Sequence, residues 1–217
     1  MTKPRTLTRR RKTAAKRVTA STDLSHDAIR AAALKLIDRD GLDAFSTRKL
    51  GAALGCEAMA IYWYYPSKEA LLDAVVDALM AGVARAVSGH EAGDWIGALR
   101  GVAHAYRGIA HDHPKAFPLL ATRRFASEGT YAFLEELFEL ARAQGIEDRV
   151  TARFYRVVSS YCSGFAMNQL AEPRGPALRK RFARVAAVST WLEPQYLDEI
   201  FSFGLELQLA ALAKATR

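Results

Sequence analysis

Four residues that can bind an anion follow one another at Ser46, Thr47, Arg48 and Lys49. They stand at the expected start of a helix over 47–54, where free backbone N–H groups and the helix dipole already favour negative charge. Because cations are disfavoured at that end of a helix, the cluster predicts a bound anion. A DNA phosphate is the candidate.

A second helical pattern follows after a short turn. Leu50 and Leu54 lie one turn apart on the first helix, and Gly55 is suited to end it in a left-handed conformation. The second pattern starts at Glu57 and places Ile61 one turn later. Two helices joined by a short turn that contains glycine form a helix-turn-helix. The alternative is an ordinary αα-hairpin of a helical bundle, with its aromatic residues in a core.

The candidate DNA contacts divide by chemistry. Small or apolar residues on the exposed face of the second helix can approach base edges and thymine methyl groups, and these are Ala58, Met59, Ala60 and Tyr62. Hydroxyl groups and cations are candidate phosphate anchors, and these are Ser46, Thr47, Arg48, Tyr62, Tyr64 and Lys68. Since few of the base-facing residues form hydrogen bonds, we expect thymine methyl contacts and DNA shape to contribute much of the specificity.

The excess positive charge is confined to the N-terminus. The chain has 217 residues and a net charge of +8, and residues 1–22 hold 8 of the 31 basic residues and no acid. We predict a disordered basic tail over 1–23 that contacts phosphates or the minor groove. A solvated tail that only aids solubility is the alternative. The sequence has no run of 18 apolar residues, so we expect no membrane span and a cytoplasmic protein.

Catalytic and metal-binding motifs are not found. The sequence has no P-loop, no GxGxxG, no Gly-x-Ser-x-Gly and no cysteine pair with zinc spacing. His111-Asp112-His113 has metal-binding residue types, but it stands at a predicted helix end, where the dipole favours histidine. We predict no enzyme, no cofactor and no metal site.

Helical patterns account for the rest of the chain. A helix over 26–39 completes a three-helix DNA-binding domain over 24–66. A long helix begins after Ser67 and leads into a second domain over 67–217. The further predicted helices of that domain cover 95–111, 128–144, 148–171, 177–189 and 194–214. The expected fold is therefore all-α, with an N-terminal helix-turn-helix domain followed by a helical ligand-binding and dimerisation domain.

The region from Leu24 to Val76 resembles the DNA-binding domain of the TetR family of repressors. Its motifs are AALKLIDRDGLDAFSTRKLGAALG and IYWYYPSKEALLDAVVD. The remainder resembles the ligand-binding, dimerising domain of the tetracycline-repressor branch, and FSFGLELQLAAL resembles the closing helix of that family. The resemblance implies a dimeric regulator with a small-molecule pocket, whose occupancy changes the spacing of two DNA-reading heads.

The last predicted helix, 194–214, is apolar nearly all round, so it must be buried on more than one side. Together with the helix over 148–171 it can form a four-helix contact across a two-fold axis. We therefore predict a homodimer through these two helices. A monomer with a large core is the alternative.

The candidate ligand contacts of the second domain are aromatic residues, polar residues and two apolar residues, Val102 and Leu120. They are Trp95, Val102, His104, Tyr106, Phe117, Leu120, Tyr131, Tyr161 and Asn168, with Gln169 as a further candidate. A plain core or interface role is the alternative for each. In the tetracycline repressor, His and Asn side chains hold the drug and its magnesium. An ungapped comparison places those positions at Ala84, Val102 and Leu120, so we expect a largely apolar effector and not tetracycline.

Three functions follow from these patterns. The first, which we expect, is a ligand-responsive repressor that binds a pseudo-palindromic DNA operator. The second is a small-molecule-binding protein or enzyme on an all-α scaffold, which leaves the basic tail unexplained. The third is a DNA-organising or adaptor protein that does not respond to an effector.

Overall fold

The computed structural model describes residues 24–88, 94–123, 127–171 and 181–216, and the predicted basic tail lies outside them. The described residues form helices joined by loops, without a strand, which confirms the all-α prediction. The helices are α1 (His26–Asp40), α2 (Thr47–Leu54), α3 (Ala58–Tyr62), α4 (Lys68–Ser88), α5 (Trp95–Asp112), α6 (Phe117–Thr122), α7 (Glu128–Ala143), α8 (Asp148–Gln169), α10 (Ala183–Ser189) and α11 (Leu197–Ala215), with 3-10 turns η1 (Thr190–Leu192) and η2 (Pro194–Tyr196) before α11.

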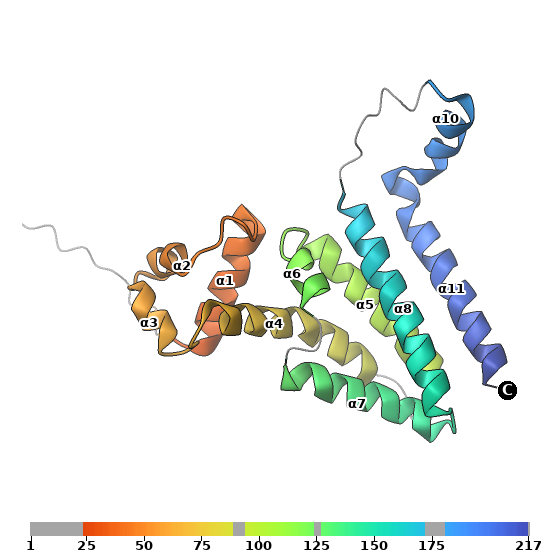
Figure 1. Ribbon diagram of the computed structural model, residues 1–217, viewed down its shortest axis with the longest axis horizontal. Helices are drawn as coiled ribbons and strands as arrows, with labels where there is room; N and C mark the ends of the chain where they lie inside the picture. Colours follow the sequence, from red (N-terminus) through yellow and green to blue (C-terminus); the bar gives the residue numbers. More distant parts are fainter. Residues whose placement is uncertain (1–23, 89–93, 124–126, 172–180, 217) are drawn as a thin grey trace, which may run out of the picture.

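Helices α1 to α3 form a small head at one end of an elongated molecule (Figure 1). Ser25 caps α1 by accepting a hydrogen bond from the backbone N–H of Ala28 at 3.1 Å. The apolar faces of the three helices meet in a core that includes Ile29, Leu50 and Ile61, each at most 1% exposed. Gly55 has a φ of 72°, the left-handed conformation that ends α2 and turns the chain into α3.

Gly51 lets α2 and α3 approach closely, because a Cβ there would lie 2.7 Å from the carbonyl oxygen of Cys56. We expect Gly51→Ala to lower the free energy of unfolding by about 1–2 kcal/mol, since the clash exceeds the gain in helix propensity. Gly108 of α5 is a matched control, because a Cβ there meets no atom within 4 Å. Gly108→Ala should stabilise the protein by up to about 1 kcal/mol. Urea denaturation at fixed protein concentration measures both changes, and changes of equal sign would contradict this account.

Helix α4 leaves the head and enters the second part of the molecule (Figure 1). It packs against α1 of the head and against α5, α6 and α7 of the second part. Two polar contacts add to this junction. His113 Nδ1 lies 2.7 Å from Asp38 Oδ2, and Lys115 Nζ donates to the carbonyl oxygen of Arg39 at 2.6 Å. The head is therefore attached to the second part through both α1 and α4.

Helices α5, α8 and α11 lie side by side in the second part (Figure 1). Tyr161 of α8 stacks on Phe201 of α11, with ring centroids 5.4 Å apart, and its hydroxyl donates to the Phe201 carbonyl oxygen at 2.9 Å. The predicted start of the last helix at Pro194 is wrong by three residues. Pro194 opens the turn η2, and the α-helix begins at Leu197. The predicted helix over 177–189 is described only from residue 181 onward, and its helical part is α10.

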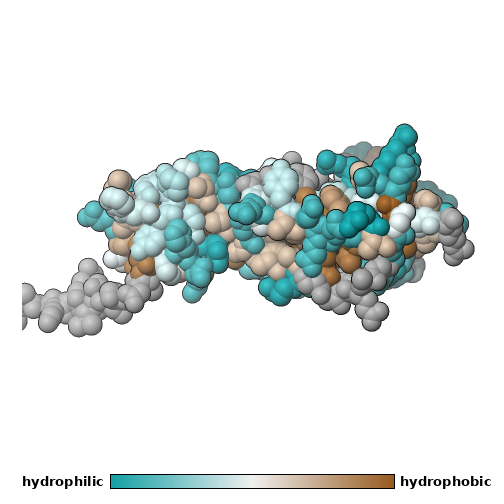
Figure 2. Space-filling model, turned by 90° about the horizontal axis from the view of Figure 1, so that it is seen from below, coloured by the Kyte–Doolittle hydropathy of each residue, from teal (hydrophilic) through white to brown (hydrophobic). Residues whose placement is uncertain are grey.

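One face of α11 is buried in the protein and another is apolar and exposed. Phe201, Leu205, Leu209 and Leu212 are buried, whereas Phe203 is 67% and Leu207 58% exposed. Val157 and Met167 of α8 are also exposed apolar residues. Figure 2 shows hydrophobic residues at the surface of this half of the molecule, among hydrophilic ones. Among the described helices, none is both long and apolar enough to cross a membrane.

Candidate nucleic-acid interface and effector cavity

The start of α2 holds the predicted anion-binding residues together. Ser46 caps the helix by accepting a hydrogen bond from the backbone N–H of Lys49 at 3.3 Å. The hydroxyls of Thr47 and Tyr62 lie 3.3 Å apart, which joins the start of α2 to the end of α3. Arg48 is exposed and forms no ion pair with the described residues. Lys49 is exposed too, but its Nζ donates to the Ala44 carbonyl oxygen at 2.8 Å.

Helix α3 presents two large side chains to solvent, Met59 and, at its end, Tyr62, which is 37% exposed. Ile61 anchors it in the head core, and Met59 on the opposite side is 66% exposed. Ala58 and Ala60 are partly buried. Trp63, directly after α3, is 88% exposed. Trp63 was not among the predicted contacts, although its place directly after Tyr62 at the end of a short predicted helix was an available signal.

Tyr64 and Lys68 hold the head together in this structure. The Tyr64 hydroxyl donates to the Leu24 carbonyl oxygen at 2.7 Å, and its ring meets the His26 ring edge-on at 5.2 Å. Lys68 Nζ donates to the Phe45 carbonyl oxygen at 3.3 Å and lies 5.5 Å from the centroid of the Phe45 ring. A phosphate contact by either side chain stays a prediction. The contacts described here stabilise the fold of the head and so position its helices.

A cavity of about 80 Å³ lies among five helices, α4 to α8. Its lining is mostly apolar with a few polar tips, and consists of Val76, Met80, Val83, Leu99, Val102, Ala103, Tyr106, Leu120, Arg123, Thr130, Phe133, Tyr155, Val158, Ser159, Cys162 and Ser163. The Tyr106 hydroxyl lies 3.0 Å from Ser163 Oγ, so two of the polar tips are joined. A concave, largely apolar site with few polar groups is typical of small-molecule binding.

The structure brings three of the predicted ligand contacts to this cavity, namely Val102, Tyr106 and Leu120. Two others are buried outside its lining: Trp95 and Phe117 are 0% exposed, and Phe117 supports the Tyr106 ring at 5.4 Å. His104 and Tyr131 are exposed on their helices. These four do not line the cavity because their helices turn those faces toward the core or the solvent.

Tyr161, Asn168 and Gln169 line a second, more open groove, between α8 and the segment from Leu192 to Ile200. The first cavity is also lined by residues that were not predicted, among them Arg123, Thr130, Ser159 and Ser163. Arg123 follows α6 and pairs with Asp73 of α4 at 2.6 Å. A short polar stretch after an apolar helix was the only available signal for it.

Cys162 is shielded inside the bundle, and burial raises the pKa of its thiol to about 12. Because the thiolate is the nucleophile, we expect a maleimide at pH 8 to label one thiol per folded chain, at the half-buried Cys56. The second thiol should react only in denaturant. Cys56→Ser should leave the folded chain unlabelled, and rapid labelling of that variant would contradict the assignment.

The raised pKa of Cys162 also affects stability, since the folded state keeps the proton that the unfolded chain loses. The contribution of this thiol to the free energy of unfolding is fully present below the usual thiol pKa of about 8.5. It falls as the pH rises from there toward 12, because the unfolded chain then ionises and the folded protein does not.

Metal-binding clusters of three or more His, Cys, Asp or Glu residues are absent from the described residues. His113, of the motif noted in the sequence, contacts Asp38 instead.

Helix α2, the left-handed turn at Gly55 and the short exposed helix α3 form a helix-turn-helix. It is attached to a helical second part that contains a cavity, and this defines the class of protein. The profile described as "Bacterial regulatory proteins, tetR family" matches residues 29–75, and that described as "Tetracyclin repressor-like, C-terminal domain" matches residues 89–216. The chain belongs to the tetR family of bacterial regulatory proteins. The resemblance noted in the sequence is thereby confirmed.

Relatives and solved structures agree with this assignment. An HTH-type transcriptional regulator of Saccharopolyspora erythraea is 32% identical over 142 residues, which are 65% of this chain and 59% of that protein, less than two thirds of its length. A possible TetR family transcriptional regulator from Streptomyces coelicolor A3(2) has a TM-score of 0.76 at 27% identity, covering 89% of this chain and 100% of that one. A TetR variant from Acinetobacter baumannii AYE in complex with minocycline has a TM-score of 0.71 at 26% identity, covering 89% and 99%.

Proposed function

We propose that the protein is a homodimeric repressor that leaves a pseudo-palindromic operator when a small, largely apolar effector enters the cavity. One observation carries the proposal: α4 belongs to both parts. It packs against α1 of the head and buries Leu71 and Leu72 near its start, and its later residues Val76, Met80 and Val83 line the cavity. A ligand that moves this wall therefore also moves the head.

DNA recognition follows from the surface of the head. Two heads enter successive major grooves, with Arg48 and the start of α2 on phosphates. Met59 and the consecutive residues Tyr62 and Trp63 are exposed and supply apolar contacts to base edges. The protein acts through this binding rather than as an enzyme, and we expect it in the cytoplasm because its DNA target is there.

The effector is expected to lack the chelating chemistry of tetracycline. Val102 and Leu120 line the cavity, and neither can hold a metal ion. The third aligned position, Ala84, is partly buried and equally without a ligand atom. The bound minocycline of the A. baumannii variant supports a small-molecule site in this fold, while the lining here favours a different compound.

The experiment that tests the proposal is selection of binding sites from a random DNA pool with the full-length protein. The affinity for the selected site and for a scrambled control is then measured at two salt concentrations. We expect a two-fold symmetric site bound at least ~1,000-fold more tightly than the control. Binding that depends steeply on salt but not on sequence would instead indicate the DNA-organising alternative.

A further inference from the structure

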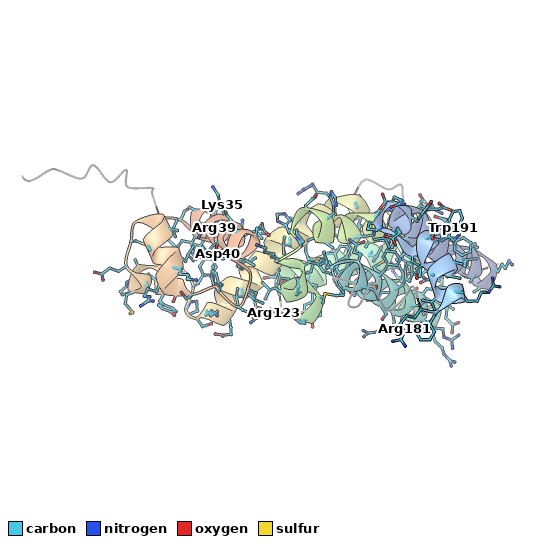
Figure 3. The ribbon with its side chains drawn as sticks, turned by 90° about the horizontal axis from the view of Figure 1, so that it is seen from above. Lys35, Arg39, Asp40, Arg123, Arg181 and Trp191 are labelled. Atoms are coloured by element: carbon cyan, nitrogen blue, oxygen red, sulfur yellow. The ribbon has the colours of Figure 1, made fainter. Side chains whose placement is uncertain are left out.

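The cavity has an apolar body and one cationic edge. Among the described residues that line it, Arg123 is the one ionised at neutral pH, and most of the others are aliphatic or aromatic. Figure 3 shows Arg123 beside α6, close to the junction between the head and the rest of the molecule. A guanidinium next to apolar walls favours an anionic partner, because an unpaired buried charge is costly.

The present partner of Arg123 belongs to α4. Arg123 Nη1 donates to Asp73 Oδ1 at 2.6 Å and to the Glu69 carbonyl oxygen at 3.4 Å. Both side chains of the ion pair are partly buried, at 27% and 32% exposed. A guanidinium has five N–H donors, and both of these contacts use Nη1. A second carboxylate can therefore use the other donors of Arg123, which lines the cavity, and share the positive charge with Asp73.

We propose that the effector is a ring compound carrying a carboxylate or a similarly acidic group, and that this group binds Arg123. The inference rests on the proposed function and names the chemical class of its effector. Binding weakens the ion pair between Arg123 and Asp73. Asp73 lies one turn before Val76, the residue at which α4 begins to line the cavity. The anion therefore acts on α4 at the end of the cavity nearest the head.

The dimensions of the cavity limit the size of the ring system. The lining residues of α4 extend from Val76 to Val83, which spans roughly 10 Å at 1.5 Å per residue. This is comparable to the length of two fused rings with one substituent.

The test compares 1-naphthoic acid with 1-naphthamide, binding to the full-length protein at pH 7.5 by isothermal titration calorimetry. The two probes have the same rings and differ in charge. We expect the acid to bind at least about tenfold more tightly. Arg123→Gln should remove that difference, whereas Arg142→Gln should keep it, because Arg142 is 71% exposed on α7 and pairs with Glu139 outside the cavity.

Asp73→Asn gives a result of opposite sign. Removing the competing carboxylate should raise the affinity for the acid several-fold and leave that for the amide unchanged. This variant and Arg123→Lys, which keeps the charge but not the planar fork, also serve if Arg123→Gln does not fold. Equal binding of the two probes, no binding of the acid, or weaker binding of the acid by Asp73→Asn would each overturn the inference.

The outcomes also separate the inference from the proposed function. A selected operator that both probes release equally would overturn the acid class and support the repressor. A preference for the acid in a protein that selects no operator would support the acid class and overturn the repressor.

Discussion

Glutamate in place of both Phe203 and Leu207 is expected to separate the protein into monomers and to abolish operator binding. The two side chains lie one turn apart on the exposed face of α11, at 67% and 58% exposed. In a two-fold interface each is used twice, and each buried side chain of this size contributes about 1.5–3 kcal/mol. Dimerisation should therefore weaken by at least about 1,000-fold, since every 1.4 kcal/mol is a factor of ten.

Sedimentation equilibrium measures this dissociation, and operator binding is measured on the same samples. Tyr131→Glu is the matched control, because Tyr131 is 60% exposed on α7, outside the face formed by α8 and α11. The control should remain dimeric and bind DNA normally. A double variant that stays dimeric at nanomolar concentration would place the interface elsewhere. A monomer that binds the operator as tightly as the natural protein would contradict the need for two heads.

The head could be predicted closely from the sequence because its helix ends are marked by local chemistry. The cap Ser46 and the left-handed Gly55 bound α2 at the predicted residues, Thr47 and Leu54. The exposure of Met59 and the burial of Ile61 follow from the helical period in so short an element. Local chemistry does not mark the start of α11 in the same way, because Pro194 is equally suited to open a 3-10 turn or an α-helix.

The cavity could not be predicted in the same way, because its lining depends on how five helices rotate against one another. In α7 the sequence offers two overlapping apolar faces. The structure buries Phe133 and Leu137, which places Tyr131 about 120° away from Leu137 around the helix and into solvent. Arg123 lies in the loop after α6, where only its tertiary contact with Asp73 reveals a role in the cavity.

Arg48→Ala is expected to weaken binding to the operator and to unrelated DNA by the same factor, about 10- to 100-fold in the dimer. The side chain is exposed at the start of α2, free of ion pairs within the described residues, and beside backbone N–H groups that favour an anion. A contact that neutralises one phosphate per head changes the slope of log K against log salt by about 0.9 per head. The slope should therefore fall by about 2 for the dimer. Fluorescence anisotropy at salt concentrations between about 50 and 200 mM measures it.

Met59→Ala provides the contrast, because an apolar side chain on the exposed face of α3 cannot bind a phosphate. It should leave the salt slope unchanged and reduce the affinity for the selected operator by about 1–3 kcal/mol per base contact that is lost, with little effect on unrelated DNA. A uniform loss across all sequences with Met59→Ala would contradict its base-reading role, and an unchanged slope with Arg48→Ala would contradict the phosphate contact. The two variants together separate the affinity of the head for DNA in general from its preference for one sequence.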